Sequence, residues 1–345
     1  MSHSRSKKAN ASGFQSEEEN DYAGALADIE RALALAPDDA DARAERADLL
    51  VELKRPDEAL LDYGAALKSS PAHYYALRGR ASVAYDREDW AQAAAWYDAA
   101  LAVYPKDGQL HALRGKVAAK LGDTNGARAH LDEAVRLAPK DTGVLYDRAD
   151  WENGQKAYDA AIADYLAIVR VKPDESAALQ GAGEAYADKG DDKSALAQYE
   201  AGLKLTPDDP SLLVDRGVVR WRADAYDSAI ADYDHALRGN PKNTAALYDR
   251  ALALDAQDQD DRAIRDLDVC LKLDPAYLDA LEERGEIYLG LDDYLRAEAD
   301  LSADLRAEPT DTRALRKRAE ALRKLGDEAG AKQDEAAAAK IDGGR

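Results

Sequence analysis

The sequence predicts an all-α protein in which pairs of helices repeat along the chain. Alanine, leucine, aspartate and arginine dominate the composition, and β-branched residues are sparse, which favours helices over strands. Prolines also recur every 34 residues without insertion or deletion, and such a fixed interval indicates a repeat architecture. They are Pro37, Pro71, Pro105, Pro139, Pro173, Pro207, Pro241, Pro275 and Pro309.

Each 34-residue unit is expected to contain two helices. With proline at position 32, position 8 is glycine or alanine, position 20 is alanine in every unit, and position 24 is large and apolar or aromatic through unit nine. Positions 4, 8 and 11 share one face of a first helix, and positions 20, 24, 27 and 28 share one face of a second. Small residues at 8 and 20 let the two helices approach closely, and larger ones would overpack the crossing.

Turn and cap residues mark the ends of these helices. Proline ends the second helix because it lacks an N–H and clashes with the preceding turn. Polar pairs such as Asp141-Thr142 and Asn243-Thr244 are expected to cap the next helix. A glycine followed by aspartate, at Gly122, Gly190 and Gly326, indicates the tight turn inside the unit.

The pattern resembles the tetratricopeptide repeat, which has a large residue at position 4, small at 8, Tyr at 11, Ala at 20, aromatic at 24, Ala at 27 and Pro at 32. A typical stretch contains Leu213, Gly217, Ala229, Tyr233, Ala236 and Pro241. The resemblance covers about residues 21–342, and helical repeats of other lengths would not keep a strict interval of 34. It implies an α-α superhelix, a right-handed solenoid of helix-turn-helix repeats.

The ends are expected to differ from the middle. We expect one solenoid over residues 21–345, with a half repeat at 21–39 and units starting at 40, 74, 108, 142, 176, 210, 244, 278 and 312. The last helix, 328–341, predicts a polar cap with Lys332, Glu335 and Ala339 on its outer face, followed by a frayed tail. Residues 1–20 are expected to be disordered or a degenerate first helix, unless the natural protein continues upstream.

Position 7 departs from the family pattern, which usually has leucine there. It is arginine in eight units: Arg46, Arg80, Arg114, Arg148, Arg216, Arg250, Arg284 and Arg318. Position 23 is aspartate in six of those eight units: Asp62, Asp164, Asp232, Asp266, Asp300 and Asp334. Of the nine units from residue 40 onward, only the one that starts at 176 lacks the arginine. It has Ala182 at position 7 and Gln198 at position 23, so the arginine and the acid are absent together. We predict an Arg–Asp bridge between the two helices of a unit; pairing with the previous unit's aspartate and a row of arginines for an anionic ligand are the alternatives.

Charge and composition exclude several functions. A net charge of −21 disfavours nucleic acid and anionic membranes as partners, and no apolar run approaches the roughly 20 residues that membrane insertion needs. No secretory signal is visible, so a cytoplasmic location is expected. The one cysteine, Cys270, forms no intrachain disulfide and falls at position 27, where a buried small residue is expected.

Catalysis, metals and cofactors are not expected. The sequence contains no Gly-x-x-x-x-Gly-Lys loop and no His-Glu-x-x-His motif. Its five histidines fall at unrelated repeat positions, which disfavours a metal cluster. The sequence therefore predicts a scaffold and no enzyme.

The family resemblance implies that positions 2, 5, 9, 12 and 13 of each first helix line a concave, peptide-binding groove. Carried over to this sequence, those positions supply Tyr75, Arg78, Tyr85, Lys116, Lys120, Tyr146, Asp150, Gln180, Glu184, Val214, Val218, Trp221, Arg222, Tyr248 and Leu252. Trp221, Tyr248 and Tyr146 are the expected anchors, because exposed aromatics supply binding hot spots. The alternative is that some of these rings pack on neighbouring helices.

Two further features concern partners. Position 9 lacks the asparagine with which some family members bind chaperone C-terminal tails, so such tails are disfavoured. Unit ten carries a basic patch, which could receive an acidic segment, although neutralisation by Asp279, Glu282 and Glu286 is the favoured account. The patch consists of Arg313, Arg316, Arg323 and Lys324.

The function predicted from the sequence is therefore a scaffold that holds a protein or peptide of unknown identity in its groove. Two alternatives stay open: a self-associating structural solenoid, or the repeat arm of a larger multidomain protein. The sequence does not determine the oligomeric state, with a monomer slightly favoured.

Overall fold

The computed structural model describes residues 22–343, and all regular structure in that range is helical. The chain divides into two compact units at Val171–Lys172, and each is described by itself. The expected single domain over 21–345 stays a prediction, and the expectation for residues 1–20 lies outside the described residues.

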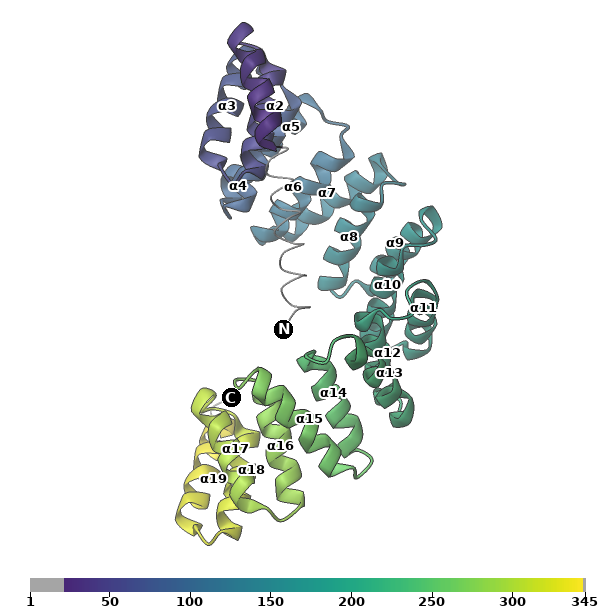
Figure 1. Ribbon diagram of the computed structural model, residues 1–345, viewed down its shortest axis with the longest axis vertical. Helices are drawn as coiled ribbons and strands as arrows, with labels where there is room; N and C mark the ends of the chain where they lie inside the picture. Colours follow the sequence, from purple (N-terminus) through teal and green to yellow (C-terminus); the bar gives the residue numbers. More distant parts are fainter. Residues whose placement is uncertain (1–21, 344–345) are drawn as a thin grey trace. The chain divides into compact units, whose positions relative to one another are not determined.

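Unit 1 begins with a helix over residues 22–35 and continues as four helix pairs, one pair in each repeat (Figure 1). The two helices of each repeat pack against each other, and the second also packs on the first helix of the next repeat. Its helices are α2 (Ala40–Glu52), α3 (Pro56–Ser69), α4 (Tyr74–Asp86), α5 (Trp90–Val103), α6 (Gly108–Lys120), α7 (Thr124–Leu137), α8 (Thr142–Gly154) and α9 (Tyr158–Val171).

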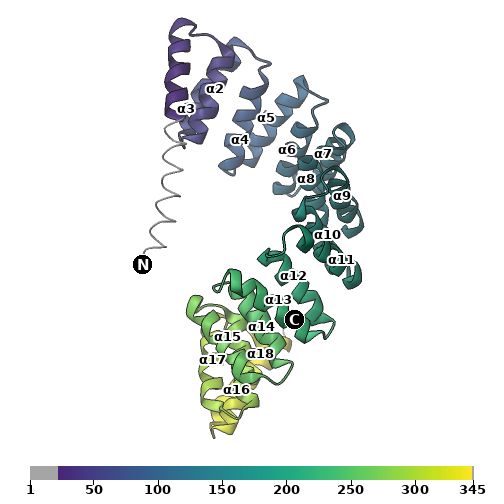
Figure 2. The ribbon, with the colours of Figure 1, turned by 45° about the vertical axis from the view of Figure 1, so that its right-hand side comes forward.

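Unit 2 follows the same plan with five helix pairs (Figure 2). Its helices are α10 (Ser176–Lys189), α11 (Asp192–Leu205), α12 (Pro210–Arg222), α13 (Tyr226–Gly239), α14 (Thr244–Asp255), α15 (Asp260–Leu273), α16 (Leu278–Gly290), α17 (Tyr294–Ala307), α18 (Thr312–Lys324) and α19 (Glu328–Gly343). The first helix of each repeat starts at the residue that the 34-residue register predicts, so the all-α helix-turn-helix fold is confirmed.

Small residues at the helix crossings have the predicted role. The position-20 alanines from Ala59 onward are completely buried. A Cβ added at Gly183 would lie 2.5 Å from Cε1 of Tyr199, and one at Gly217 would lie 2.6 Å from Cε1 of Tyr233. The position-24 ring of these repeats therefore fills the space that the position-8 glycine leaves open. Cys270 is also buried, as predicted for position 27.

The caps and turns follow the sequence signals in part. The Asp141 side chain accepts hydrogen bonds from the N–H groups of Gly143 and Val144, and Asn243 accepts one from Ala246, as predicted. The turn residue at position 15 has a positive φ in all nine complete repeats. Only three of those residues are glycine; the others, which carry no sequence signature, are Lys54, Glu88, Lys156, Asp224, Asp258 and Asp292.

The C-terminal helix corrects the predicted boundary of 328–341. Helix α19 continues to Gly343, so Asp342 belongs to the helix and not to a frayed tail. The Arg316 guanidinium donates a hydrogen bond to the Asp342 carboxylate, which ties this last turn to α18. Lys332, Glu335 and Ala339 are exposed on this helix, and its role as a polar cap stays a prediction.

The predicted Arg–Asp bridges are confirmed in all six repeats that carry both residues. Each arginine donates through Nε and Nη2 to the two carboxylate oxygens, with nitrogen-to-oxygen distances between 2.6 and 3.0 Å. All six aspartates are buried. Such bidentate pairs are short, directional and satisfy both oxygens, so the position-7 arginines are structural.

Several arginines also reach the preceding repeat, at position 25. Nη1 of Arg148, Arg250 and Arg284 lies 3.0, 2.6 and 2.6 Å from the aspartate oxygen there. Each of these side chains thus connects three helices, and we call this series the arginine ladder. Arg80 and Arg114 lack a position-23 aspartate: Arg80 stacks 4.1 Å from the centre of the Trp96 ring, and Arg114 binds the preceding repeat only.

Candidate peptide-binding groove

The first helices of the repeats form the surface on which the predicted groove residues lie. Within unit 1, α2 contacts α4 and α6 contacts α8, and within unit 2 the even-numbered helices from α10 to α18 contact one another in series. Residues at positions 2, 5, 6 and 9 of neighbouring repeats therefore come together across adjacent helices. The chain contributes one such surface in each unit.

The start of the unit 1 surface contains an open aromatic ring beside acids. Tyr75 is 56% exposed and packs edge-on against Tyr74, with ring centres 5.3 Å apart. It borders a cavity of about 240 Å³ lined by Asp41, Ala44, Glu45, Asp48 and Tyr75. Arg78 is exposed on the same helix.

Most other predicted groove residues of unit 1 are engaged within the protein. Tyr85 packs edge-on against Trp90 at 4.9 Å, and the Lys120 ammonium lies 5.8 Å from the centre of the same indole. Lys116 forms an ion pair of 2.8 Å with Asp147 of the next repeat. Burial is the largest single influence and disfavours the ammonium charge, but the hydrogen bond and the charge of Asp147, with further nearby acids, together raise the pKa of Lys116.

Tyr146, one of the three expected anchors, is half-buried on α8. Its ring packs edge-on against Tyr165, with centres 6.2 Å apart. The hydroxyl of Tyr165 donates a hydrogen bond of 2.6 Å to Asp150, another predicted groove residue. Tyr146 lies in unit 1 while Trp221 and Tyr248 lie in unit 2, so the structure does not bring the three anchors together in one described site.

Unit 2 has a cavity on the predicted surface, of about 270 Å³ between α10 and α12. It is lined by Glu184, Ala187, Asp188, Tyr199, Asp215, Val218, Val219 and Arg222. The Asp215 carboxylate accepts a hydrogen bond of 2.7 Å from Gln180, and burial raises its pKa. The Arg222 guanidinium is held 2.6 Å from Asp192. We call this the α10–α12 pocket.

The next part of the unit 2 surface is aromatic. Trp221, Tyr248 and Tyr277 are half-buried and pack against one hydrophobic cluster under α12, α14 and α16. The rings of Tyr248 and Tyr277 meet edge-on with centres 5.4 Å apart. Nε1 of Trp221 is buried and has no hydrogen-bond acceptor among residues 22–343. The anchors therefore contribute to packing with one face and keep part of their surface open.

Two carboxylates that the sequence reasoning missed flank Tyr248. Burial raises the pKa of Asp249 to about 6, and the charge of Asp215 adds to the effect. Burial also raises the pKa of Glu283 to about 7, reinforced by Asp255 and Glu286. Both carboxylates, together with burial, raise the pKa of the Tyr248 hydroxyl. The available signal was an acid at position 6 in successive repeats, a position outside the family's groove set.

The basic patch of the last repeat, which starts at residue 312, has partners in that repeat and in the one before it, all within unit 2. Arg313 lies 3.0 Å from Glu282 and 2.7 Å from Glu286, in agreement with the favoured neutralisation. Arg323 pairs with Glu335 at 2.6 Å, and the Lys324 ammonium lies 5.8 Å from the centre of the Tyr294 ring. Reception of an acidic segment by this patch stays a prediction.

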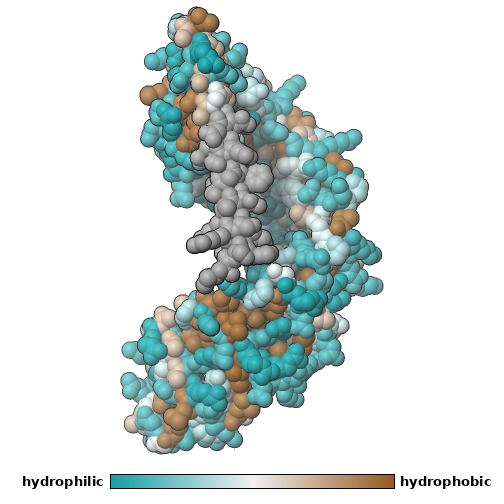
Figure 3. Space-filling view, in the orientation of Figure 1, coloured by the Kyte–Doolittle hydropathy of each residue, from teal (hydrophilic) through white to brown (hydrophobic). Residues whose placement is uncertain are grey.

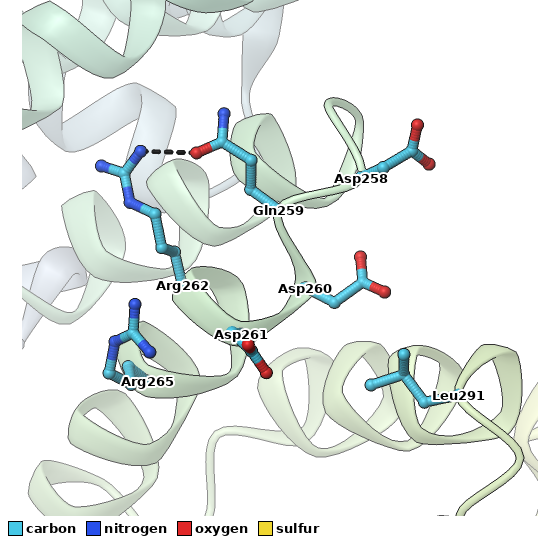
Figure 4. Close-up of a pocket in the computed structure, with 7 residues that line it drawn as sticks. All are labelled: Asp258, Gln259, Asp260, Asp261, Arg262, Arg265 and Leu291. Carbon is cyan, nitrogen blue, oxygen red and sulfur yellow. Dashed lines mark hydrogen bonds between the residues drawn. The ribbon is translucent and has the colours of Figure 1, made fainter.

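A wider depression, of about 430 Å³, lies at the turn between α14 and α15 (Figure 4). Its lining is Asp258, Gln259, Asp260, Asp261, Arg262, Arg265 and Leu291. Figure 4 shows Arg262 bound to Gln259 and the aspartates pointing outward, so these polar groups do not converge on one point. The face of the molecule seen in Figure 3 is largely hydrophilic with hydrophobic patches between.

Among residues 22–343, no group of three His, Cys, Asp or Glu side chains is arranged to hold a metal ion. No helix in that range is both long and apolar enough to cross a membrane.

Sequence profiles of known families decide the family. Profiles described as tetratricopeptide repeat match residues 17–61, 46–108, 78–142 and 214–277, and one described as TPR repeat matches residues 183–224. The chain belongs to the tetratricopeptide repeat family. No curated protein matches the sequence.

Solved structures similar to this tetratricopeptide repeat chain share its fold. A tetratricopeptide repeat protein from Parabacteroides merdae is 16% identical over 77% of this chain and 98% of that one, with a TM-score of 0.56. A chain of the APC/C hetero-tetramer Cut9–Hcn1 is 18% identical over 80% of this chain and 55% of that one, with a TM-score of 0.54. PilF of Pseudomonas aeruginosa is 20% identical over 61% and 96%, with a TM-score of 0.51.

Proposed function

We propose that this chain is a non-enzymatic scaffold that binds a segment of another protein along its first helices. The family supports this function, since tetratricopeptide repeats form scaffolds consistent with protein–protein interaction. One observation carries the proposal: Val218 of α12 lines the α10–α12 pocket, and half-buried Trp221 and Tyr248 lie on α12 and the adjacent helix α14. Rigid aromatics with one packed face and one open face provide contact area at a small entropic cost.

The proposed contact residues are those that the family resemblance implied. In unit 1 they are Tyr75, Arg78, Tyr85, Lys116, Lys120 and Tyr146. In unit 2 they are Val218, Trp221, Arg222, Tyr248 and Leu252. The internal partners of Lys116 and Arg222 reduce their availability, so the aromatic and aliphatic members of unit 2 are expected to contribute most.

Immobilised chain exposed to an extract of its source cells tests the groove. A double variant, Val218→Asn with Leu252→Asn, removes apolar contacts from half-buried groove positions. The matched control, Leu61→Asn with Leu295→Asn, removes leucines that are 75% and 71% exposed elsewhere. The unchanged chain and the control should retain the same protein, and the groove variant should lose it.

The three aromatic anchors expected from the sequence need a second comparison because they also pack in the core. A chain with Tyr146→Ala, Trp221→Ala and Tyr248→Ala should lose the same protein, provided that its circular dichroism remains helical. Equal retention by every variant would move the binding surface away from the first helices and contradict the proposal.

A further inference from the structure

Two acids at position 6, Asp147 and Asp215, have a partner from the preceding repeat. Asp147 is held by Lys116 at 2.8 Å, from position 9 of the repeat before it. Asp215 accepts a hydrogen bond of 2.7 Å from Gln180, at position 5 of the repeat before it. The same contact occurs with its charges reversed where Lys317, at position 6, lies 3.4 Å from Glu286.

The position-6 acids in the middle of unit 2, Asp249 and Glu283, differ in this respect. The preceding positions 5 and 9 are Val214 and Val218 for Asp249, and they are Tyr248 and Leu252 for Glu283. None of these side chains offers a cation, and neither acid has a hydrogen-bond or ion-pair partner in the part of the chain that the structure describes. Arg313 is the cation that acts on Glu283, but it is bound to Glu282 and Glu286.

These two carboxylates are therefore half-buried, and no cation of the described residues pairs with them. Both are only partly exposed, and burying a carboxylate without a partner costs free energy. Protein surfaces that retain such groups can recover that cost when a ligand supplies the opposite charge. Asp249 follows Tyr248 on α14, Glu283 lies on α16, and these two helices are in contact, with Tyr248 packed in the hydrophobic cluster between them.

We propose that the surface formed by α12, α14 and α16 binds a basic segment of a protein partner, with an arginine or lysine head group between Asp249 and Glu283. This inference deepens the proposed scaffold function and depends on it. The aliphatic stem of the basic residue would lie over Tyr248 and Leu252, since long basic side chains bury their methylenes on apolar surface. The tyrosine ring adds attraction for the cation through its face.

The neighbouring α10–α12 pocket is also acidic. Its lining contains three carboxylates, Glu184, Asp188 and Asp215, and one arginine that is paired with Asp192. Asp215 lies on α12 and Asp249 on α14, and the contact between these helices places the pocket next to the central site. A second basic residue of the same segment fits this pocket. An acidic partner would meet repulsion along the whole stretch.

Labelled peptides of one length test the charge selectivity on the full chain. Arginine, citrulline or glutamate occupies the same positions between leucine and alanine residues, and fluorescence anisotropy measures binding. The arginine peptide should bind on the order of tenfold more tightly than the citrulline peptide, which keeps the shape but not the charge. Equal affinities of these two peptides would overturn the proposal.

Two variants assign the selectivity to the site. Asp249→Asn with Glu283→Gln should abolish the preference for arginine over citrulline, while Asp174→Asn with Asp258→Asn, an equal loss of charge at exposed turns, should keep it. A preference that survives the first pair would overturn the site. If all the peptides bind equally well and the groove variant Val218→Asn with Leu252→Asn binds them more weakly, the scaffold function stands and only this inference is removed. If the groove variant binds them as well as the unchanged chain does, both are removed.

The chain's own basic start is the competing occupant. It contains Arg5, Lys7 and Lys8. Replacing all three by alanine should leave the affinity for the arginine peptide unchanged. A several-fold tighter affinity would show that this segment fills the site and would overturn its assignment to a partner.

Discussion

The groove surfaces of the two units differ in how they treat the same kind of charge. In unit 1 the position-6 acid Asp147 is bound by Lys116, and the Trp90 ring lies beside the Lys120 ammonium. In the middle of unit 2, the repeats that precede Asp249 and Glu283 carry valine, tyrosine and leucine at positions 5 and 9 and no cation. The acid at position 6 therefore links two neighbouring repeats in unit 1, whereas in the middle of unit 2 it is available to pair with a ligand. The residues at positions 5 and 9 of the preceding repeat decide which outcome occurs.

The largest expected effect comes from removing a position-7 arginine, a residue that joins helices in both units. Arg250→Ala would leave the buried Asp266 carboxylate without its bidentate partner, and breaking such a pair costs about 3–5 kcal/mol of unfolding free energy. Arg114→Ala is the unit 1 control, because Arg114 pairs only with Asp98, whose side chain is 54% exposed. Urea unfolding should show the larger loss for Arg250→Ala, with a clear coupling energy in a cycle with Asp266→Ala. Zero coupling would contradict the structural role of the ladder.

A second test removes an acid that occurs only in unit 2. Asp304 is buried at position 27, where Ala100 and Ala134 stand in unit 1, and its Oδ2 has no partner among the described residues. Burial raises its pKa to about 6, reinforced by Asp311 and Glu308. Asp304→Ala should therefore stabilise the chain by about 1–3 kcal/mol at pH 8.

The pH dependence of that gain follows from the sign of the shift. The folded chain holds the Asp304 proton more tightly than the unfolded chain, so the unfolding free energy falls as pH rises from about 4 to about 6. Above that range the penalty is complete, and below it the penalty is absent. Thermal melts of the variant and the parent should converge near pH 4, and a gain that is constant with pH would contradict the assignment.

A third change transfers the unit 1 partner into unit 2. Val218→Lys places a lysine at position 9 before Asp249, as Lys116 stands before Asp147. The melting temperature should rise slightly, by an amount equivalent to about 1 kcal/mol for a partly exposed pair. The same variant should bind the arginine peptide more weakly, because the charge of Asp249 is then already compensated. Val218→Met, of similar bulk and no charge, is the control that should retain binding.

The smallest expected effect concerns the pH dependence of binding. A basic segment prefers ionised acids, and the pKa values of Asp249 and Glu283 are raised to about 6 and about 7. Affinity for the arginine peptide should therefore fall several-fold between pH 8 and pH 5.5, and the Asp249→Asn, Glu283→Gln variant should show a flat profile. A wild-type affinity that rises on acidification would contradict the proposed site.

Local rules in the sequence predicted most of the fold. The proline interval gave the start of every first helix, and the joint absence of arginine and aspartate at Ala182 and Gln198 indicated that those residues pair elsewhere. The left-handed turns at non-glycine residues such as Lys54 were missed, because the turn is imposed by the two helices that it connects. The exact end of α19 depended on a contact with Arg316, which comes from another helix.

The candidate site was less predictable. Family positions indicated Trp221 and Tyr248, but they did not show that both rings are half-buried in one cluster. Asp249 and Glu283 lie at a position that the family pattern leaves unassigned. Their chemistry depends on residues about 31 to 35 places earlier, which only the packing of successive first helices brings close.

The arginine ladder has a consequence for how the gene for such a chain can change. Arg250 binds Asp234 before it and Asp266 within its repeat, and Arg284 repeats the arrangement with Asp268 and Asp300. Deleting residues 244–277 would bring Asp234 opposite Arg284, and duplicating them would add an arginine together with both of its acids. The array can therefore gain or lose whole repeats by recombination without stranding a buried charge.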